Sequence, residues 1–169
     1  VSLSEAEVHW REFLASLQDR GLHGVELITS DDHKGLRAAL KARFAGVTWQ
    51  RCQFHLQQNA QGYVPRRGLR RKAAEGLRGI FNASDRAEAD RKLADFVKAW
   101  REKAPKLAAW AAENIGEGLA VFGLDLTEAQ RKRLRTTNSL ENLNQQIKRR
   151  TAVARLFPNE ASLLRLASA

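Results

Sequence analysis

The stretch from residue 24 to residue 52 constrains the fold of this chain more than any other part of the sequence. It begins with the apolar, β-branched segment GVELIT (24–29), continues with DDHKGLRAALKARFAG (31–46) and ends with VTWQRC (47–52). The first and last segments are typical of strands. The middle segment predicts a helix whose inward face carries Leu36, Ala39, Leu40 and Phe44. A strand, a helix and a strand within about 30 residues form a βαβ unit, so we expect a mainly parallel sheet.

Helical patterns lie on both sides of this unit. The segment SEAEVHWREFLASLQDRG (4–21) predicts a helix that Ser4 and Glu7 would cap and Gly21 would end. Its inward face carries Trp10, Phe13, Leu14 and Leu17. Beyond residue 54 two apolar stripes at helical spacing follow, formed by Leu69, Ala73, Leu77, Ile80 and Phe81 and by Ala89, Leu93, Phe96, Val97 and Trp100.

The helical character continues almost to the end of the chain. Pro105 is expected to open a further helix, and GLAVFGL (118–124) fits either a short strand or a buried turn. Thr127 and Gln130 have capping-box spacing, and a last helix is predicted to begin near Asn138. These patterns indicate an α/β protein with a large helical middle, whose boundaries fall near residues 60 and 135.

The charge of the chain is unevenly distributed. The formal net charge is +10, yet residues 1–60 hold seven basic and seven acidic side chains, whereas residues 61–169 hold 22 basic and 12 acidic ones. A basic half beside a neutral half favours a polyanionic partner, above all nucleic acid. The alternative interpretation is that the chain is simply a generally basic protein. The sequence contains no apolar run long enough to span a membrane. It contains a single cysteine, which suits a reducing compartment. Because the chain starts with Val and contains no Met, we expect a processed or partial chain.

Two carboxylates follow the first predicted strand directly. Asp31 and Asp32 stand where α/β proteins usually carry their sites, at the carboxyl end of a strand. One of them is expected to cap the following helix. If Asp32 does so, Asp31 remains available to bind a metal ion.

A third carboxylate lies within a strongly basic segment. Between Arg131 and Arg155 there are eight Lys or Arg residues and one acid, Glu141. A carboxylate there would repel phosphate unless a divalent cation lay between them, and hard oxygen ligands suit Mg²⁺ or Mn²⁺. Alternatively, Asn138 and Glu141 have the spacing of a capping box.

Cys52 and His55 form a C-x-x-H motif. A structural zinc site needs two further ligands, and the other histidines are scattered, so such a site is not expected. A buried thiol at a strand end, beside a polar histidine near the site, is the simpler interpretation.

Three segments together resemble a known family. They are GVELITSDDHKGL, WQRCQFHLQQNA and LRTTNSLENLNQQIKRRTAVARLFPNEASLLRL, and they are similar to the transposases of the Mutator-like superfamily, especially the bacterial IS256 group. The resemblance implies a DDE transposase with a partial RNase H-like fold that a large α-helical insertion interrupts. It implies core residues 1–60, an insertion over 61–134, and a segment 135–169 with the last catalytic helix.

The resemblance also implies roles for individual residues. Asp31, in the S-D-x-H stretch that ends at His33, matches the second catalytic Asp, and Glu141, in T-T-N-x-x-E, matches the catalytic Glu. Both would bind the Mg²⁺ or Mn²⁺ ions of a two-metal site. Cys52 and His55 match the family's C-x-x-H, whose role stays open. The basic residues expected to bind transposon ends and target DNA are Arg131, Lys132, Arg133, Arg135, Lys148, Arg149 and Arg150.

The chain departs from the family pattern in two respects. Asn142 stands where the family usually has Arg, directly after the catalytic Glu. The first catalytic Asp and the early strands are missing, so the chain resembles the C-terminal two-thirds of a catalytic domain and is expected to be inactive in isolation. The exposed sheet edge this would leave favours a homo-oligomer. The resemblance implies a bacterial cytoplasmic, nucleoid-associated protein.

Two other functions fit the same residues. One is a non-catalytic, basic, helical DNA-binding module, and the other is a different RNase H-like nuclease. Metal binding at Asp31 and Glu141 would separate a transposase from the first, and strand-transfer products would separate it from the second.

Overall fold

The computed structural model describes residues 6–153, 159, 161–162 and 164–165. The described part of the chain is mostly helical and contains one two-stranded sheet. It divides into two compact units, residues 1–136 and residues 137–169. None of the described helices is both long enough and apolar enough to cross a membrane.

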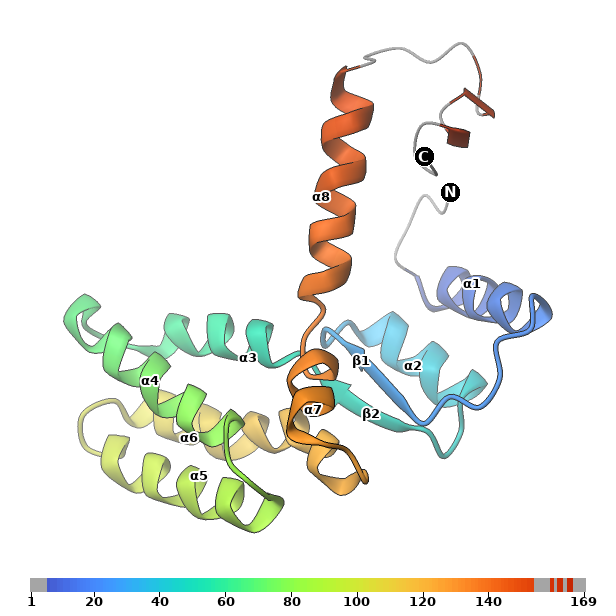
Figure 1. The fold of residues 1–169 in the computed structure, drawn as a ribbon. Helices are drawn as coiled ribbons and strands as arrows, with labels where there is room; N and C mark the ends of the chain where they lie inside the picture. Colours follow the sequence, from blue (N-terminus) through green and yellow to red (C-terminus); the bar gives the residue numbers. More distant parts are fainter. Residues whose placement is uncertain (1–5, 154–158, 160, 163, 166–169) are drawn as a thin grey trace. The chain divides into compact units, whose positions relative to one another are not determined.

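The predicted βαβ unit is present. Strand β1 (Leu27–Ser30) pairs in parallel with β2 (Thr48–Arg51), and α2 (Lys34–Arg43) connects them (Figure 1). Helix α1 (Glu7–Asp19) packs against α2. These elements share a small core made of Leu14, Ala39 and Leu40, against which Trp10, Leu17, Ile28, Leu36, Phe44 and Trp49 pack.

Details at the amino end differ from the prediction. The N-cap of α1 is Ala6 and makes no side-chain cap bond, while Ser4 lies outside the described residues. Phe13, predicted to face inward, is 51% exposed and meets the ring of Trp10 edge-on. Gly21 does follow the helix end, with a φ of 96°, which residues with a side chain rarely adopt.

Residues 53–134 form the predicted succession of helices. Both apolar stripes and the helix opened by Pro105 contribute to one core, in which Leu56, Leu77, Leu107 and Ile115 are fully buried. The elements are α3 (Gln53–Ala60), η1 (Gln61–Tyr63), η2 (Arg67–Leu69), α4 (Arg70–Phe81), α5 (Arg86–Trp100), α6 (Pro105–Asn114), η3 (Ile115–Gly118), η4 (Ala120–Gly123) and α7 (Glu128–Leu134).

Two local predictions for this helical part can be compared with the structure. Thr127 and Gln130 form the predicted capping box at the start of α7. Residues 118–124 form short 3₁₀ turns and no strand, with Leu119 and Val121 buried. The buried-turn alternative is therefore correct for this segment.

Buried polar side chains join the sheet to the helical part. Gln50 of β2 is fully buried and accepts a hydrogen bond from Val121 N at 2.7 Å. Gln53, the first residue of α3, donates to Gly118 O at 2.7 Å. Because an unsatisfied buried amide is costly, these bonds fix η3 and η4 against the carboxyl end of β2.

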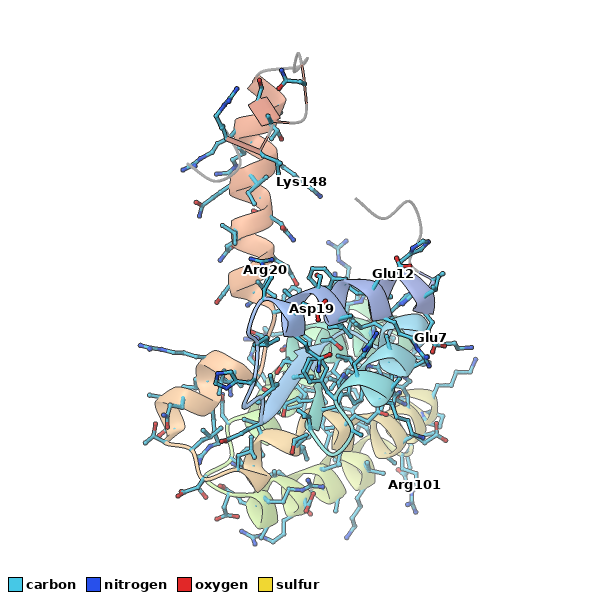
Figure 2. All side chains as sticks on the ribbon, turned by 90° about the vertical axis from the view of Figure 1, so that its right-hand side faces the viewer. Glu7, Glu12, Asp19, Arg20, Arg101 and Lys148 are labelled. Carbon is cyan, nitrogen blue, oxygen red and sulfur yellow. The ribbon has the colours of Figure 1, made fainter. Side chains whose placement is uncertain are left out.

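The second unit contains α8 (Asn138–Val153), which begins at the predicted residue. Its polar surface carries exposed Lys148, Arg149 and Arg150, and Lys148 projects from the helix in Figure 2.

Candidate active site

The register of the sheet brings Asp31 and Cys52 side by side. Ser30 pairs with Arg51 at the last position of the ladder, and Cys52 N donates to Ser30 O at 2.8 Å. The next residue of the first strand is Asp31, so its backbone leaves the sheet beside Cys52. Both residues thus lie at the carboxyl ends of parallel strands, where sites of α/β proteins are usually found.

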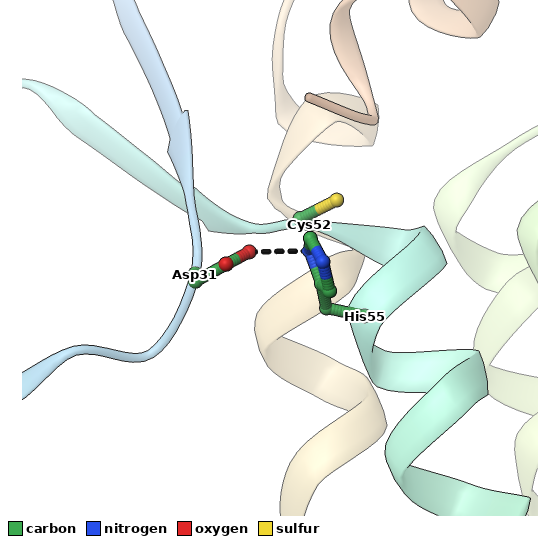
Figure 3. A group of neighbouring side chains, drawn as sticks. All are labelled: Asp31, Cys52 and His55. Carbon is green, nitrogen blue, oxygen red and sulfur yellow. Dashed lines mark ion pairs between the residues drawn. The ribbon is translucent and has the colours of Figure 1, made fainter. Parts of the chain in front are cut away.

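His55 completes a cluster with these two residues. Cys52 is the N-cap of α3, and the first turn of that helix carries His55 to the side chain of Asp31, where Nδ1 and Oδ1 lie 2.5 Å apart (Figure 3). Cys52 is fully buried, whereas the side chains of His55 and Asp31 are 25% and 54% exposed. The three side chains can each offer one metal-binding atom, and these atoms all lie within 4.8 Å of one another.

Asp32 does not cap α2, which corrects the prediction. The N-cap is His33, whose Nδ1 accepts a hydrogen bond from Leu36 N at 3.4 Å. Asp32 instead accepts a hydrogen bond from Arg37 at 2.8 Å and lies 3.4 Å from Arg51. Its charge is thus balanced by two guanidinium groups, while the carboxylate of Asp31 points to His55.

Glu117 extends this ion-pair network into the helical part. One carboxylate oxygen lies 3.3 Å from Arg37 and the other 3.3 Å from Arg51. Arg51 is only 7% exposed and also donates to Asn114 at 3.0 Å. A nearly buried arginine needs such partners because burial of an unpaired charge is strongly unfavourable. Sequence patterns did not reveal this network because its members lie up to 85 residues apart, between Asp32 and Glu117.

Glu141 lies in the first turn of α8. Its N–H donates to Thr137 O at 3.0 Å, and its carboxylate accepts a hydrogen bond from the Thr137 hydroxyl at 3.1 Å. The helix begins at Asn138, and the capping box suggested by the spacing of Asn138 and Glu141 stays a prediction. Asp31 and Glu141 belong to different units, and their approach to each other stays a prediction.

The basic residues of α7 divide into two groups. Arg131 donates to Leu126 O at 2.8 Å and to Ser84 O at 3.0 Å, and its guanidinium lies over the ring of Phe122. Lys132 pairs with Glu128 at 2.5 Å, whereas Arg133 is exposed. The guanidinium of Arg131 is therefore engaged within the unit, while Arg133 faces solvent.

Arg135 is the C-cap of α7 and anchors this helix. Its guanidinium donates to Phe81 O at 2.9 Å and to Asn82 Oδ1 at 2.7 Å, while its own carbonyl accepts from Gln53 N at 3.0 Å. Burial lowers the pKa of Arg135 from its ordinary value, and the charge of Glu128 opposes this shift. Arg135 thus links the start of α3, next to Cys52, to the end of α4.

A hollow in the first unit lies elsewhere. It encloses about 350 Å³ and is lined by residues of β1, α2 and β2 that include Ile28, Phe44 and Trp49. None of the residues of the Asp31–Cys52–His55 cluster lines it. The cluster therefore lies at the strand ends, partly exposed through Asp31, and is not the floor of this hollow.

The sequence is similar to known transposases over its full length. Residues 1–169 match the family described as "Transposase, Mutator family". The chain is 54% identical over its whole length to the transposase for insertion sequence element IS406 of Burkholderia multivorans, of which it covers 43%. It is 41% identical over 98% of its length to the transposase for ISRM5 of Rhizobium meliloti, covering 41% of that protein.

A more distant relative shows the same coverage. The chain is 34% identical, over its whole length, to the transposase for insertion sequence element IS256 in transposon Tn4001 of Staphylococcus aureus, of which it covers 43%. The chain therefore spans less than half the length of these relatives.

Proposed function

Because this chain belongs to the Mutator family of transposases, we propose that it carries part of a metal-dependent phosphoryl-transfer site for DNA. In this proposal Asp31 and Glu141 are two of the metal-binding carboxylates of a DDE-type centre on a partial RNase H-like core. The cleavage of transposon ends and the joining to target DNA would be activities of a longer protein, as long as the relatives named above.

The position of Asp31 is the observation that carries this proposal. Its carboxylate lies at the carboxyl end of β1, is half exposed, and contacts His55, whereas the two arginines pair with Asp32. An exposed hard oxygen ligand fits Mg²⁺ or Mn²⁺. A pair of such ions, when bound, activates the attacking oxygen and stabilises the leaving oxygen of a phosphodiester.

Neighbouring side chains would orient the two metal-binding carboxylates. The contact with His55 holds the carboxylate of Asp31 at the strand end, and the Thr137 hydroxyl orients the carboxylate of Glu141. Asp31 and Glu141 supply two carboxylates, whereas the related DDE enzymes use three. We therefore expect the 169-residue chain to lack DNA cleavage activity with Mg²⁺ or Mn²⁺.

Exposed basic residues would hold the phosphates of DNA. Arg133 on α7 and Lys148, Arg149 and Arg150 on α8 face solvent. A further exposed group lies at the start of α4 and comprises Arg66, Arg67, Arg70, Arg71 and Lys72. Their charges attract any DNA sequence equally, because contacts to phosphate carry no base information.

Metal titration tests the proposal on the chain itself. Mn²⁺ binding, followed by electron paramagnetic resonance, should weaken in Asp31→Asn and in Glu141→Gln. If both carboxylates hold the same ions, the double variant should lose less than the sum of the two single losses. Asp19→Asn, at an exposed position on α1 (Figure 2), should bind like the parent.

The outcomes separate the possible functions. Unchanged Mn²⁺ binding in both single variants would favour a non-catalytic DNA-binding module. Plasmid nicking by the isolated chain that persists in Glu141→Gln would show that the catalytic centre lies elsewhere.

A further inference from the structure

The C-x-x-H motif gains a third metal ligand in the folded chain. Cys52 and His55 alone offer too few ligands for zinc, but the sheet register adds the carboxylate of Asp31. Three protein ligands plus one open position are the usual arrangement of non-structural zinc sites.

We propose that Asp31, Cys52 and His55 form a binding site for Zn²⁺ or a similar borderline-soft divalent ion. The carboxylate of Asp31, the sulfur of Cys52 and one imidazole nitrogen of His55 would be the ligands, and water would take the fourth position. Binding converts the thiol of Cys52 to a thiolate and releases its proton to solvent.

The ligand atoms are already close to the required arrangement. Around a tetrahedral zinc ion, neighbouring ligand atoms lie roughly 3.3–3.7 Å apart. In the cluster they lie within 4.8 Å of one another, and the Asp31–His55 contact is 2.5 Å. Modest rotations of the side chains therefore suffice, with the imidazole and the carboxylate moving apart to admit the ion.

The backbone fixes two of the ligands and leaves the third accessible. Cys52 is held by the bond to Ser30 O and by its place at the start of α3, where Leu56 N donates to its carbonyl at 3.0 Å. His55 lies in the same helical turn, whereas Asp31 lies just beyond the strand with its side chain half exposed. Asp31 is therefore the most exposed of the three ligands, and an ion would approach the cluster from its side.

The ligand set distinguishes this site from a magnesium site. Mg²⁺ prefers oxygen ligands and keeps its waters, so it gains little from a thiolate and an imidazole. Zn²⁺ takes all three donors. If the function proposed above is correct, Zn²⁺ at this site would compete with Mg²⁺ for Asp31 and act as an inhibitor of the catalytic centre.

Cobalt provides a direct test because the sequence contains one cysteine. Co²⁺ bound to a thiolate gives a near-ultraviolet charge-transfer band, so any such band must come from Cys52. We expect the band to saturate at one Co²⁺ per chain, to disappear on addition of one equivalent of Zn²⁺, and to resist excess Mg²⁺. Absence of the band in the folded parent chain would overturn the proposal.

Single substitutions decide whether all three residues are ligands. Asp31→Asn and His55→Asn should each weaken Co²⁺ binding by more than about 100-fold, because even the loss of a residue that only orients a ligand often weakens binding by 10–100-fold. His23→Asn, at an exposed position, is the matched control and should leave affinity unchanged. If both variants bind Co²⁺ with the affinity of the parent chain, Cys52 binds the ion without Asp31 and His55. This result would contradict the proposed three-ligand site.

This test is independent of the proposed catalytic function. The cobalt band requires neither DNA nor Mg²⁺, so its absence would leave Mn²⁺ binding at Asp31 and Glu141 as a separate question. Conversely, a cobalt band without Mn²⁺ binding would support the Zn²⁺ site and count against the catalytic one. Competition is shown if one equivalent of Zn²⁺ abolishes the Mn²⁺ binding that depends on Asp31.

Discussion

Asp31 and Asp32 are neighbours in the sequence, but their carboxylates contact different helices. Asp31 lies beside His55 of α3, whereas Asp32 accepts a hydrogen bond from Arg37 of α2 and lies near Arg51. The pair therefore separates a carboxylate suited to ligand binding from one that holds the fold together.

Substitution of the two aspartates should have different effects. Asp32→Asn should lower the free energy of unfolding by about 1 kcal/mol, because it removes a charge from a partly exposed network around the nearly buried Arg51. Asp31→Asn should mainly reduce metal binding. Urea unfolding together with Mn²⁺ and Co²⁺ titration of both variants measures the two effects. Loss of metal binding in Asp32→Asn at unchanged stability would reverse the assignment.

DNA binding should depend strongly on salt. If six basic side chains contact phosphates, a plot of log K against log salt concentration should have a slope of about −5. Replacing Arg133, Lys148, Arg149 and Arg150 by Ala should make the slope less steep by about 3.6, at roughly 0.9 per phosphate contact. Fluorescence anisotropy with DNA duplexes of unrelated sequence measures this slope. The substitutions should weaken binding to all of the duplexes alike.

Arg131→Ala is the control for that experiment. Its guanidinium already binds two backbone carbonyls, so its loss should destabilise the fold by about 2 kcal/mol and change the salt slope little. A slope change of about 1 at unchanged stability would instead identify Arg131 as a phosphate ligand.

Acid should weaken the start of α5. The hydrogen bond with Lys92 and those from the backbone N–H and hydroxyl of Ser84 lower the pKa of Glu88 from 4.5 to about 2. Since the folded-state pKa is the lower one, the stabilisation is complete above pH 4.5 and is lost as the pH falls towards 2. Thermal unfolding between these pH values should therefore show a smaller loss of stability with falling pH in Glu88→Gln than in the parent. An identical pH profile would refute this contribution.

Gly118 should not tolerate a side chain. A Cβ at this position would lie 2.6 Å from Leu56 Cδ1 and 3.4 Å from the ring of Phe81, both in the buried core. Gly118→Ala should therefore destabilise the chain by about 1–3 kcal/mol in chemical denaturation. Gly116→Ala in the same 3₁₀ turn meets no atom within 4 Å and serves as the control. Equal stability of the two variants would contradict the close approach.

The periodicity of apolar residues predicted much of the first unit. It identified the parallel strands, the helix between them, and the two stripes that form the larger core. These features follow from the spacing of nearby apolar residues, which can be read from a single sequence. Phe13 was placed wrongly because its spacing fits the inward stripe of α1, yet it is 51% exposed and lies outside the small core.

The candidate site was only partly predictable. The ends of the predicted strands indicated Asp31 and Cys52, but the contact with His55 depends on how α3 leaves the sheet. The N-cap was assigned to Asp32 because Asp is a common cap, while the arginines that pair with it are Arg37 of the same α2 helix and Arg51 of β2. Asp32 pairs with these two arginines, and His33 caps the helix in its place.

The hydrogen bonds of Gln50 and Arg51 have a consequence for how the first unit opens. The side-chain oxygen of Gln50 accepts from Val121 N, and Arg51 donates to Asn114, so these hydrogen bonds join the sheet to distant helical segments. Separating them would leave these groups without partners at once, which favours a single concerted opening. The amide hydrogens of β2 and of the 115–121 segment should consequently exchange with solvent at a common rate, although about 65–70 residues separate them in the chain.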